Sequence, residues 1–227
     1  MHLVQDYEYN LFFLDNCNMP VFEYTALDVK GKSVSGIIDA GFDTNPKEIE
    51  SNCIPKIKSG ADLFVISPDG SGKSSTIVIS IIQQLKKAVE EVPRAIIITS
   101  SKEKAFEMEE QFKLLGKNTN LRTFVVFDNG ILQYQKDMIY EGLDILIGTA
   151  RRINELLSIT GIPTSDLKIV AVDDAETLFP NQNHPVVYRL ADRTKKLQFL
   201  IFANKWHEKF EDLFERILKN PFVIRKS

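Results

Sequence analysis

Cysteine is scarce in this chain. Cys17 and Cys53 are the only two among 227 residues, and neither belongs to a CxxC or Cys/His cluster. Such isolated thiols indicate neither a disulfide framework nor a structural zinc site. Free cysteines in small number are typical of a reducing compartment, so we expect a cytoplasmic protein.

An excess of positive charge is also missing, since 28 Lys and Arg stand against 31 Asp and Glu, a formal net charge of −3. No global field attracts a polyanion, so strong unspecific binding of nucleic acid is not expected, although a local basic face remains open. No apolar run approaches the about 20 residues that a membrane helix needs. Residues 1–10 lack the basic start of a signal peptide. We therefore expect neither membrane insertion nor secretion.

Hydrophobic residues make up 44% of the chain, enough for one sizeable α/β core. From residue 63 onward, short apolar runs alternate with amphipathic stretches. The apolar runs predict strands at 63–66, 95–98, 123–126, 145–147, 169–172 and 199–202. Helices are predicted at 46–58, 74–90, 101–115, 131–140, 151–157 and 185–194. Strands that are apolar throughout predict a mostly parallel sheet with helices on both faces.

The first 23 residues form a short N-terminal extension. Two aromatic runs, 9–14 and 21–24, flank the turn-forming residues 15–18, a pattern that favours a β-hairpin. We therefore divide the chain into this extension, 1–23, and one domain, 24–227.

A phosphate-binding loop follows the first predicted strand of the domain. Residues 67–74 read SPDGSGKS, and a helical run begins directly after them. This is a P-loop in the required strand, loop and helix context, in which glycines let backbone N–H groups turn around phosphate oxygens. The residues expected to hold the nucleotide are Pro68, Asp69, Gly70, Ser71, Gly72, Lys73 and Ser74. Lys73 neutralises phosphate charge and Ser74 binds Mg²⁺ in this interpretation, whereas a Gly/Ser-rich turn with an incidental lysine is the alternative.

Two acids follow a later apolar strand, 169–172, in the segment DDAE at 173–176. Asp173 is expected to hold Mg²⁺ through water, and Asp174 to position the water that attacks the phosphate. In the alternative interpretation these acids only begin a helix.

The order of these and other segments resembles the DEAD-box family of ATP-dependent RNA helicases. Gly41-Phe42, Pro46, Ile49-Glu50 and Ile54-Pro55 are similar to its Q motif, with Glu50 in place of glutamine. The segment TSSKEKAFE (99–107) resembles PTRELAxQ, and DILIGTARR (144–152) resembles DILVATPGR. The segment QFLIFANKW (198–206) is similar to the strand that ends in the Ser-Ala-Thr motif. The resemblance covers residues 24–227.

The resemblance implies the RecA-like P-loop NTPase fold of the first helicase domain, with ATP and Mg²⁺ as ligands. It implies that Tyr24 stacks on adenine beside Glu50, although a core aromatic is an equally good interpretation of Tyr24. It also implies contacts to the RNA backbone from Ser101, Lys102, Thr149 and Arg152. The second RecA-like domain, which supplies arginine fingers, is not encoded in residues 1–227, so unwinding by this chain alone is not expected.

Several positions depart from the family pattern. Glu50 only accepts hydrogen bonds, which removes half of the adenine readout. Asp174 is one methylene shorter than the family's glutamate, and 203–205 (ANK) lack both hydroxyls of the Ser-Ala-Thr motif. Asp128-Asn129 stands where the family has two glycines that approach the RNA.

Two functions therefore remain. The first is an ATP-binding helicase-like domain with weak or partner-dependent ATPase activity and weak, backbone-directed RNA binding, acting with a second RecA-like domain or a partner protein. The alternative is a catalytically inactive pseudo-helicase that serves as a nucleotide-binding or protein-interaction scaffold. A third interpretation, a small-molecule P-loop kinase, fits the phosphate loop but not the segments after it.

Overall fold

The computed structural model describes residues 47–89, 91–117, 119–194, 196–218 and 220–226, together with the backbone of four short strands before them. These strands form two antiparallel pairs, β1 (Leu11–Phe12) with β2 (Val21–Phe22) and β3 (Ala26–Leu27) with β4 (Ser33–Val34). The residues between β1 and β2 lie outside the described part, so the hairpin and the boundary at residue 23 stay predictions. Tyr24 also lies outside it.

Within the described residues, one sheet of seven parallel strands organises the domain, in the order β11-β5-β10-β9-β6-β8-β7. The predicted parallel sheet is confirmed. The strands that correspond to the six predicted runs are β5 (Leu63–Ile66), β6 (Ala95–Thr99), β7 (Thr123–Val126), β8 (Ile145–Thr149), β9 (Ile169–Val172) and β10 (Gln198–Ala203). The additional strand β11 (Phe222–Arg225) was not predicted; it is a mostly exposed edge strand.

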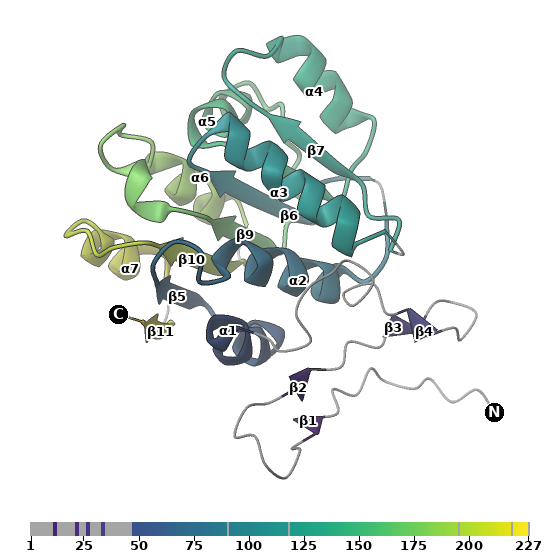
Figure 1. Cartoon of the computed structure of the whole chain (residues 1–227). Coiled ribbons are helices and arrows are strands. Elements are labelled where there is room, and N and C mark those ends of the chain that lie inside the picture. Colours follow the sequence, from purple (N-terminus) through teal and green to yellow (C-terminus); the bar gives the residue numbers. More distant parts are fainter. Residues whose placement is uncertain are drawn as a thin grey trace.

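Helices cover both faces of the sheet, and the direction of each crossover decides which face (Figure 1). From β5 to β7 the chain travels one way along the sheet, and from β7 back to β11 it travels the other way. Right-handed crossovers therefore place the first helices on one face and the later helices on the opposite face. One face carries α1 (Glu48–Lys58), α2 (Lys73–Leu85) and α3 (Lys102–Leu115), and the other carries α4 (Leu132–Tyr140), α5 (Ala150–Ser158), α6 (Pro185–Arg193) and α7 (Phe210–Ile217).

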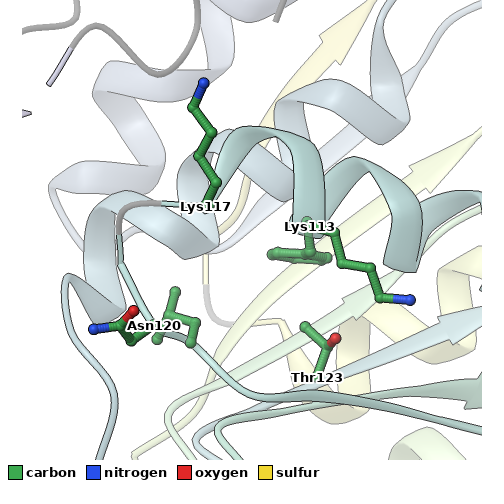
Figure 2. A pocket seen from close by; sticks show the side chains of 7 residues that line it. Lys113, Lys117, Asn120 and Thr123 are labelled. Atoms are coloured by element: carbon green, nitrogen blue, oxygen red, sulfur yellow. The ribbon is translucent and has the colours of Figure 1, made fainter.

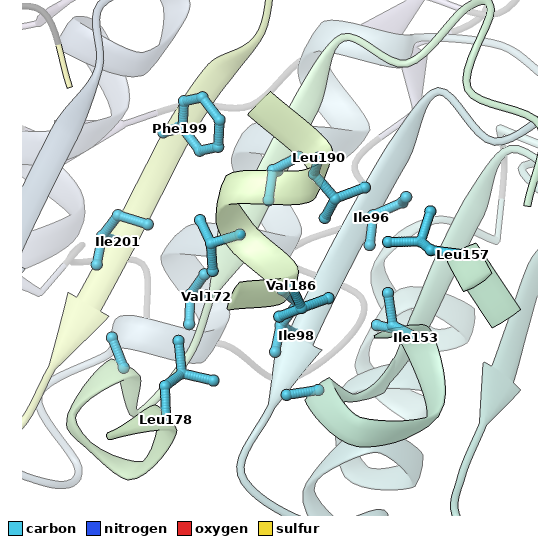
Figure 3. Close-up of a cluster of buried hydrophobic side chains, with 14 of the residues drawn as sticks. Ile96, Ile98, Ile153, Leu157, Val172, Leu178, Val186, Leu190, Phe199 and Ile201 are labelled. Atoms are coloured by element: carbon cyan, nitrogen blue, oxygen red, sulfur yellow. The ribbon is translucent and has the colours of Figure 1, made fainter. Parts of the chain in front are cut away.

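Alternate residues of each central strand contribute to two hydrophobic clusters. Ile96 and Ile98 of β6 belong to the cluster under α5 and α6 (Figure 3), whereas Ala95 and Ile97 belong to the cluster under α2 and α3. Successive side chains of a strand point to opposite faces, so a strand covered on both faces has to be apolar at every position. This burial explains the uninterrupted apolar runs in the sequence.

The predicted helix at 74–90 is wrong at its carboxyl end, because α2 ends at Leu85. Lys86 has a φ of 62°, in the left-handed region that does not continue an α-helix. The guanidinium of Arg94 donates to the carbonyl oxygens of Leu85 and Lys87, and it forms an ion pair with the buried Asp144. A side chain from beyond the helix thus donates to carbonyl oxygens at its carboxyl end. No helix among the described residues is both long and apolar enough to cross a membrane.

Candidate active site

The candidate site lies where three neighbouring parallel strands end. β5 leads into the P-loop, β9 leads into Asp173, and β10 lies between them in the sheet. The backbone N–H of Ser67 donates to the carbonyl oxygen of Ala203, which fixes the P-loop beside the end of β10. The carboxyl ends of parallel strands form one edge of the sheet, the usual place for ligands in open α/β folds.

Two glycines shape the P-loop. Gly70 has a φ of 76° and Gly72 a φ of 103°, both in the region that favours glycine. A Cβ on Gly72 would also lie 2.9 Å from Cδ of Lys47 and 3.3 Å from Oε1 of Glu50. Helix α2 begins at the next residue, so its first N–H groups and the positive end of its dipole face the loop.

Lys73 is folded back into the loop, and its side chain is only 5% exposed. Its ammonium group donates to the carbonyl oxygens of Ser67 and Pro68, each at 2.9 Å, and to Oδ1 of Asn204 at 2.5 Å. Oδ1 of Asp69 lies 3.8 Å away. A phosphate group that enters the loop has to compete with these acceptors for the lysine.

Ser74 and Asp173 form the part of the site that fits a magnesium ion. The Ser74 hydroxyl donates to Oδ2 of Asp173 at 2.8 Å. Asp173 is 3% exposed, and its Oδ1 has no hydrogen-bond donor. Burial raises the pKa of Asp173, and the neighbouring Asp174 raises it further, against the effects of Ser74 and Lys73. A buried carboxylate oxygen without a donor is costly, and Mg²⁺ or its water is a suitable partner for it.

Asp174 is held on both carboxylate oxygens. Oδ2 accepts from the Ser100 hydroxyl, and Oδ1 accepts from Nδ2 of Asn204, each at 3.0 Å. Its backbone has a φ of 54°, which Asp tolerates better than most residues. Backbone in this region is strained, and strained residues cluster at functional sites. The side chain therefore has a fixed position beside Asp173.

Glu50 lies against the P-loop on the side of α1 and is 7% exposed. Its Oε2 accepts from the backbone N–H of Lys47 at 2.9 Å, as in a helix capping box. Its Oε1 accepts from the hydroxyl of Ser75 at 2.6 Å. Both oxygens are thus engaged with protein donors next to the loop.

The four residues expected to contact RNA lie at or just after the carboxyl ends of β6 and β8, farther along the same edge of the sheet. Ser101 caps α3 by accepting from the N–H of Lys104, and Lys102 is exposed with its ammonium group 4.3 Å from the centre of the Phe127 ring. Thr149 donates to the carboxylate of Asp128. Arg152 is 4% exposed and donates to the carbonyl oxygens of Asp128 and Gly130. Thr149 and Arg152 therefore fix the loop at 128–130, while Lys102 stays on the surface.

The family model for DEAD/DEAH box helicases matches residues 47–213. The chain belongs to the DEAD/DEAH box helicase family. Among curated relatives, it is 26% identical over 220 residues to the pre-mRNA-processing ATP-dependent RNA helicase PRP5 of Debaryomyces hansenii, covering 92% of this chain and 24% of that protein. It is 26% identical to DEAD-box ATP-dependent RNA helicase 8 of Arabidopsis thaliana, covering 89% of this chain and 40% of that protein. The chain thus spans less than half the length of these relatives.

Solved structures show the same fold. The DEAD box protein of Methanococcus jannaschii matches with a TM-score of 0.79 and 18% identity, over 90% of this chain and 57% of that one. A hypothetical ATP-dependent RNA helicase from Sulfolobus tokodaii matches with a TM-score of 0.74 and 21% identity, over 84% of this chain and 55% of that one. The predicted RecA-like fold is confirmed.

Asn204 is the site residue that the sequence analysis missed in this helicase-family domain. The segment 203–205 was interpreted only as the loss of two hydroxyls, yet Asn204 contacts both Lys73 and Asp174. Its backbone N–H also donates to the carboxylate of Glu176 at 3.1 Å. The sequence shows that Asn204 follows an apolar run. This position indicates a site residue only when β10 is known to lie between β5 and β9.

A separate pocket of about 180 Å³ lies at the carboxyl end of α3 (Figure 2). It is lined by Phe112, Lys113, Gly116, Lys117, Asn120, Leu121 and Thr123. Helix α3 begins beside the carboxyl ends of the strands and runs back across the sheet, so its last turn lies at the opposite edge. The pocket therefore takes no part in the candidate site.

Proposed function

We propose that this domain binds ATP with Mg²⁺ and hydrolyses it weakly, or only together with a partner, as a DEAD-box RNA helicase-like domain. The observation that carries the proposal is the pair of Ser74 and the buried Asp173, in which one carboxylate oxygen has no donor. Ser74 follows Lys73 directly, and the ammonium group of Lys73 lies within the P-loop. The P-loop N–H groups, Lys73 and Ser74 thus meet Asp173, which comes from a distant part of the sequence, at one edge of the sheet.

Each group has a separate task in this proposal. The P-loop N–H groups and Lys73 hold the phosphates, while Ser74 and Asp173 hold Mg²⁺, which neutralises phosphate charge when bound. Asp174 positions the attacking water, because its carboxylate is fixed by Ser100 and Asn204. Glu50 lies beside the loop and supports it through Ser75.

Titration calorimetry with Mg·ATP tests the phosphate site. Lys73→Ala is expected to weaken binding at least tenfold, since it removes the cation that faces the phosphates. Lys136→Ala is the matched control: it removes the same charge from α4, beside β7 at the far edge of the sheet. Equal affinities for the parent chain and Lys73→Ala would show that the loop is not the phosphate site.

Neighbouring serines on α2 test the metal ligand. Ser74→Ala is expected to reduce the gain in ATP affinity that Mg²⁺ provides, whereas Ser75→Ala, whose hydroxyl contacts Glu50, should keep it. A parent chain that binds no nucleotide at all would favour the alternative, a pseudo-helicase that serves as a protein-interaction scaffold.

We further propose that RNA binds weakly along the ends of β6 and β8 through its phosphates. The support is the exposed Lys102 beside the loop that Thr149 and Arg152 hold. Lys102→Ala is expected to weaken the binding of single-stranded RNA and to reduce its salt dependence by about one phosphate contact. Fluorescence anisotropy over a salt series measures this, with Lys136→Ala as the control. Salt-independent binding would contradict the proposal.

A further inference from the structure

Asn204 lies between the two charged groups at the centre of the site. Its Oδ1 accepts from the ammonium of Lys73 and its Nδ2 donates to the carboxylate of Asp174. The reverse orientation of the amide would place NH₂ against the ammonium and the carbonyl oxygen against the carboxylate. The two charges therefore fix the amide in one orientation, and the side chain of Asn204 connects them.

The strand order of the sheet, with β10 between β5 and β9, fixes the position of Asn204. Ala203, at the end of β10, accepts from the first residue of the P-loop, and the backbone N–H of Asn204 donates to Glu176 after β9. Residues that follow the two neighbouring strands thus hold the backbone of Ala203 and Asn204. Neither of the hydroxyls expected at 203 and 205 from the family motif is needed for these contacts.

We propose that Asn204 is a latch on Lys73 that the terminal phosphate of a nucleoside triphosphate releases. The inference rests on the proposed function, that the loop binds ATP. The phosphate carries negative charge and competes with the neutral amide for the ammonium group, so Lys73 transfers from Oδ1 of Asn204 to the phosphate. The amide oxygen then has no donor, and it faces the space beside Asp174.

Release of the latch prepares the site for the attacking water. Nδ2 of Asn204 keeps its hydrogen bond to Asp174, while the freed Oδ1 accepts a hydrogen bond from a water molecule that Asp174 also orients. Asn204 is then a positioning residue that responds to the nucleotide. The same side chain opposes triphosphate binding and supports hydrolysis. Its removal is therefore expected to raise the affinity for ATP and to lower the rate of hydrolysis.

Three variants test the latch by calorimetry with Mg·ATP. Asn204→Ala removes the competing acceptor, so ATP binding is expected to become about two- to tenfold tighter, the value of one ordinary hydrogen bond. Asn204→Asp replaces the neutral amide by a carboxylate, so binding is expected to become at least tenfold weaker. Lys205→Ala is the matched control for Asn204→Asp, because it also lowers the charge by one unit and residue 205 is exposed.

A double-mutant cycle separates the latch from damage to the fold. In the Lys73→Ala background, Asn204→Ala is expected to leave the remaining ATP affinity unchanged, since no ammonium group is left to release. In single-turnover measurements with the chain in excess over ATP, followed long enough to detect very slow hydrolysis, Asn204→Ala with the parent lysine is expected to hydrolyse bound ATP more slowly although it binds ATP more tightly.

The outcomes distinguish the latch from the proposed function. Weaker or unchanged ATP binding by Asn204→Ala would overturn the latch, even where Lys73→Ala shows that the P-loop binds ATP. Equal losses of ATP affinity in Asn204→Asp and Lys205→Ala would show a general effect of the lowered net charge, and this result would also overturn the latch. A parent chain that binds no triphosphate would remove both the proposed function and the latch.

Discussion

Asp174 has a short side chain that two neighbouring residues hold in one position. It is one methylene shorter than the glutamate of the family motif, but it reaches both Ser100 and Asn204. Its left-handed backbone turns the short side chain toward these partners. Because a misplacement of about 1 Å costs roughly 100-fold in rate, the proposed catalytic role of Asp174 depends on this fixed position.

Arg94 and Asp144 form a buried ion pair whose contribution to stability depends on pH. Burial raises the pKa of Asp144, but the N–H groups of Val89 and Arg122 and the charge of Arg94 outweigh it, so the pKa lies below its ordinary value of 3.8. The native state therefore prefers the charged form. The stabilisation is complete above about pH 3.8 and is lost as the pH falls below it.

We predict that Asp144→Asn lowers the free energy of unfolding by about 3–5 kcal/mol at pH 7, because it leaves a buried arginine without its counter-charge. The difference from the parent chain is expected to shrink as the pH falls below 3.8. Urea unfolding from pH 7 to pH 3 measures it. The exposed Asp137→Asn is the control, and a difference that does not shrink between pH 7 and pH 3 would contradict the role of the charged pair.

Helix α1 supports the P-loop from one side. The ammonium group of Lys47 donates to the carbonyl oxygen of Gly70 at 2.9 Å, and Glu50 connects the first turn of α1 to Ser75 of α2. The position that resembles the adenine-reading glutamine thus has a structural task in this chain. Its two oxygens accept from the protein, and neither offers a donor to a base.

We predict relaxed base selectivity, so that GTP competes with ATP more strongly than the family pattern implies. Glu50→Gln is expected to sharpen the preference for ATP, because the new amide donates to adenine N7. The same change costs about 1 kcal/mol of stability, since an NH₂ group cannot accept from the Lys47 N–H. Competition binding and thermal unfolding measure the two effects, with the exposed Glu48→Gln as the control. A large preference for ATP in the parent chain would refute the prediction.

At the scale of the whole molecule, the described domain forms one continuous sheet with its candidate site open along one edge. The resemblance implies that a second RecA-like domain adds arginine fingers at such an edge. An arginine finger is worth about 10³ to 10⁵ in rate in related phosphoryl-transfer enzymes. This contribution is much larger than any adjustment of Asp174.

We therefore predict that residues 1–227 hydrolyse ATP very slowly or not detectably, and that RNA does not stimulate them. Asp174→Glu alone is expected to rescue little, because it does not supply the arginines. Phosphate release with and without RNA measures this, and Lys73→Ala gives the background. Robust turnover stimulated by RNA and abolished by Lys73→Ala would show that the chain completes its own active site, for example as an oligomer.

The strands, most helices and the loop between β5 and α2 could be predicted from the sequence because their signals are local. A strand buried on both faces is apolar throughout, and a P-loop is one short segment between a strand and a helix. The carboxyl end of α2 and the elements α7 and β11 were not predicted in this way. Helix α7 and β11 are placed beside β5 partly by contacts of Phe64 with Phe210 and Phe214, which lie far away in the sequence.

The sequence by itself determined that the chain carries a P-loop, a following pair of acids and the order of segments found in DEAD-box helicases. Only the tertiary structure decided that β10 lies between β5 and β9, which brings Asn204 between Lys73 and Asp174. It also decided that Arg152 is buried against the loop at 128–130 and that both oxygens of Glu50 are occupied. The order of parallel strands follows from pairing between distant segments, and the local pattern of residues does not encode that pairing.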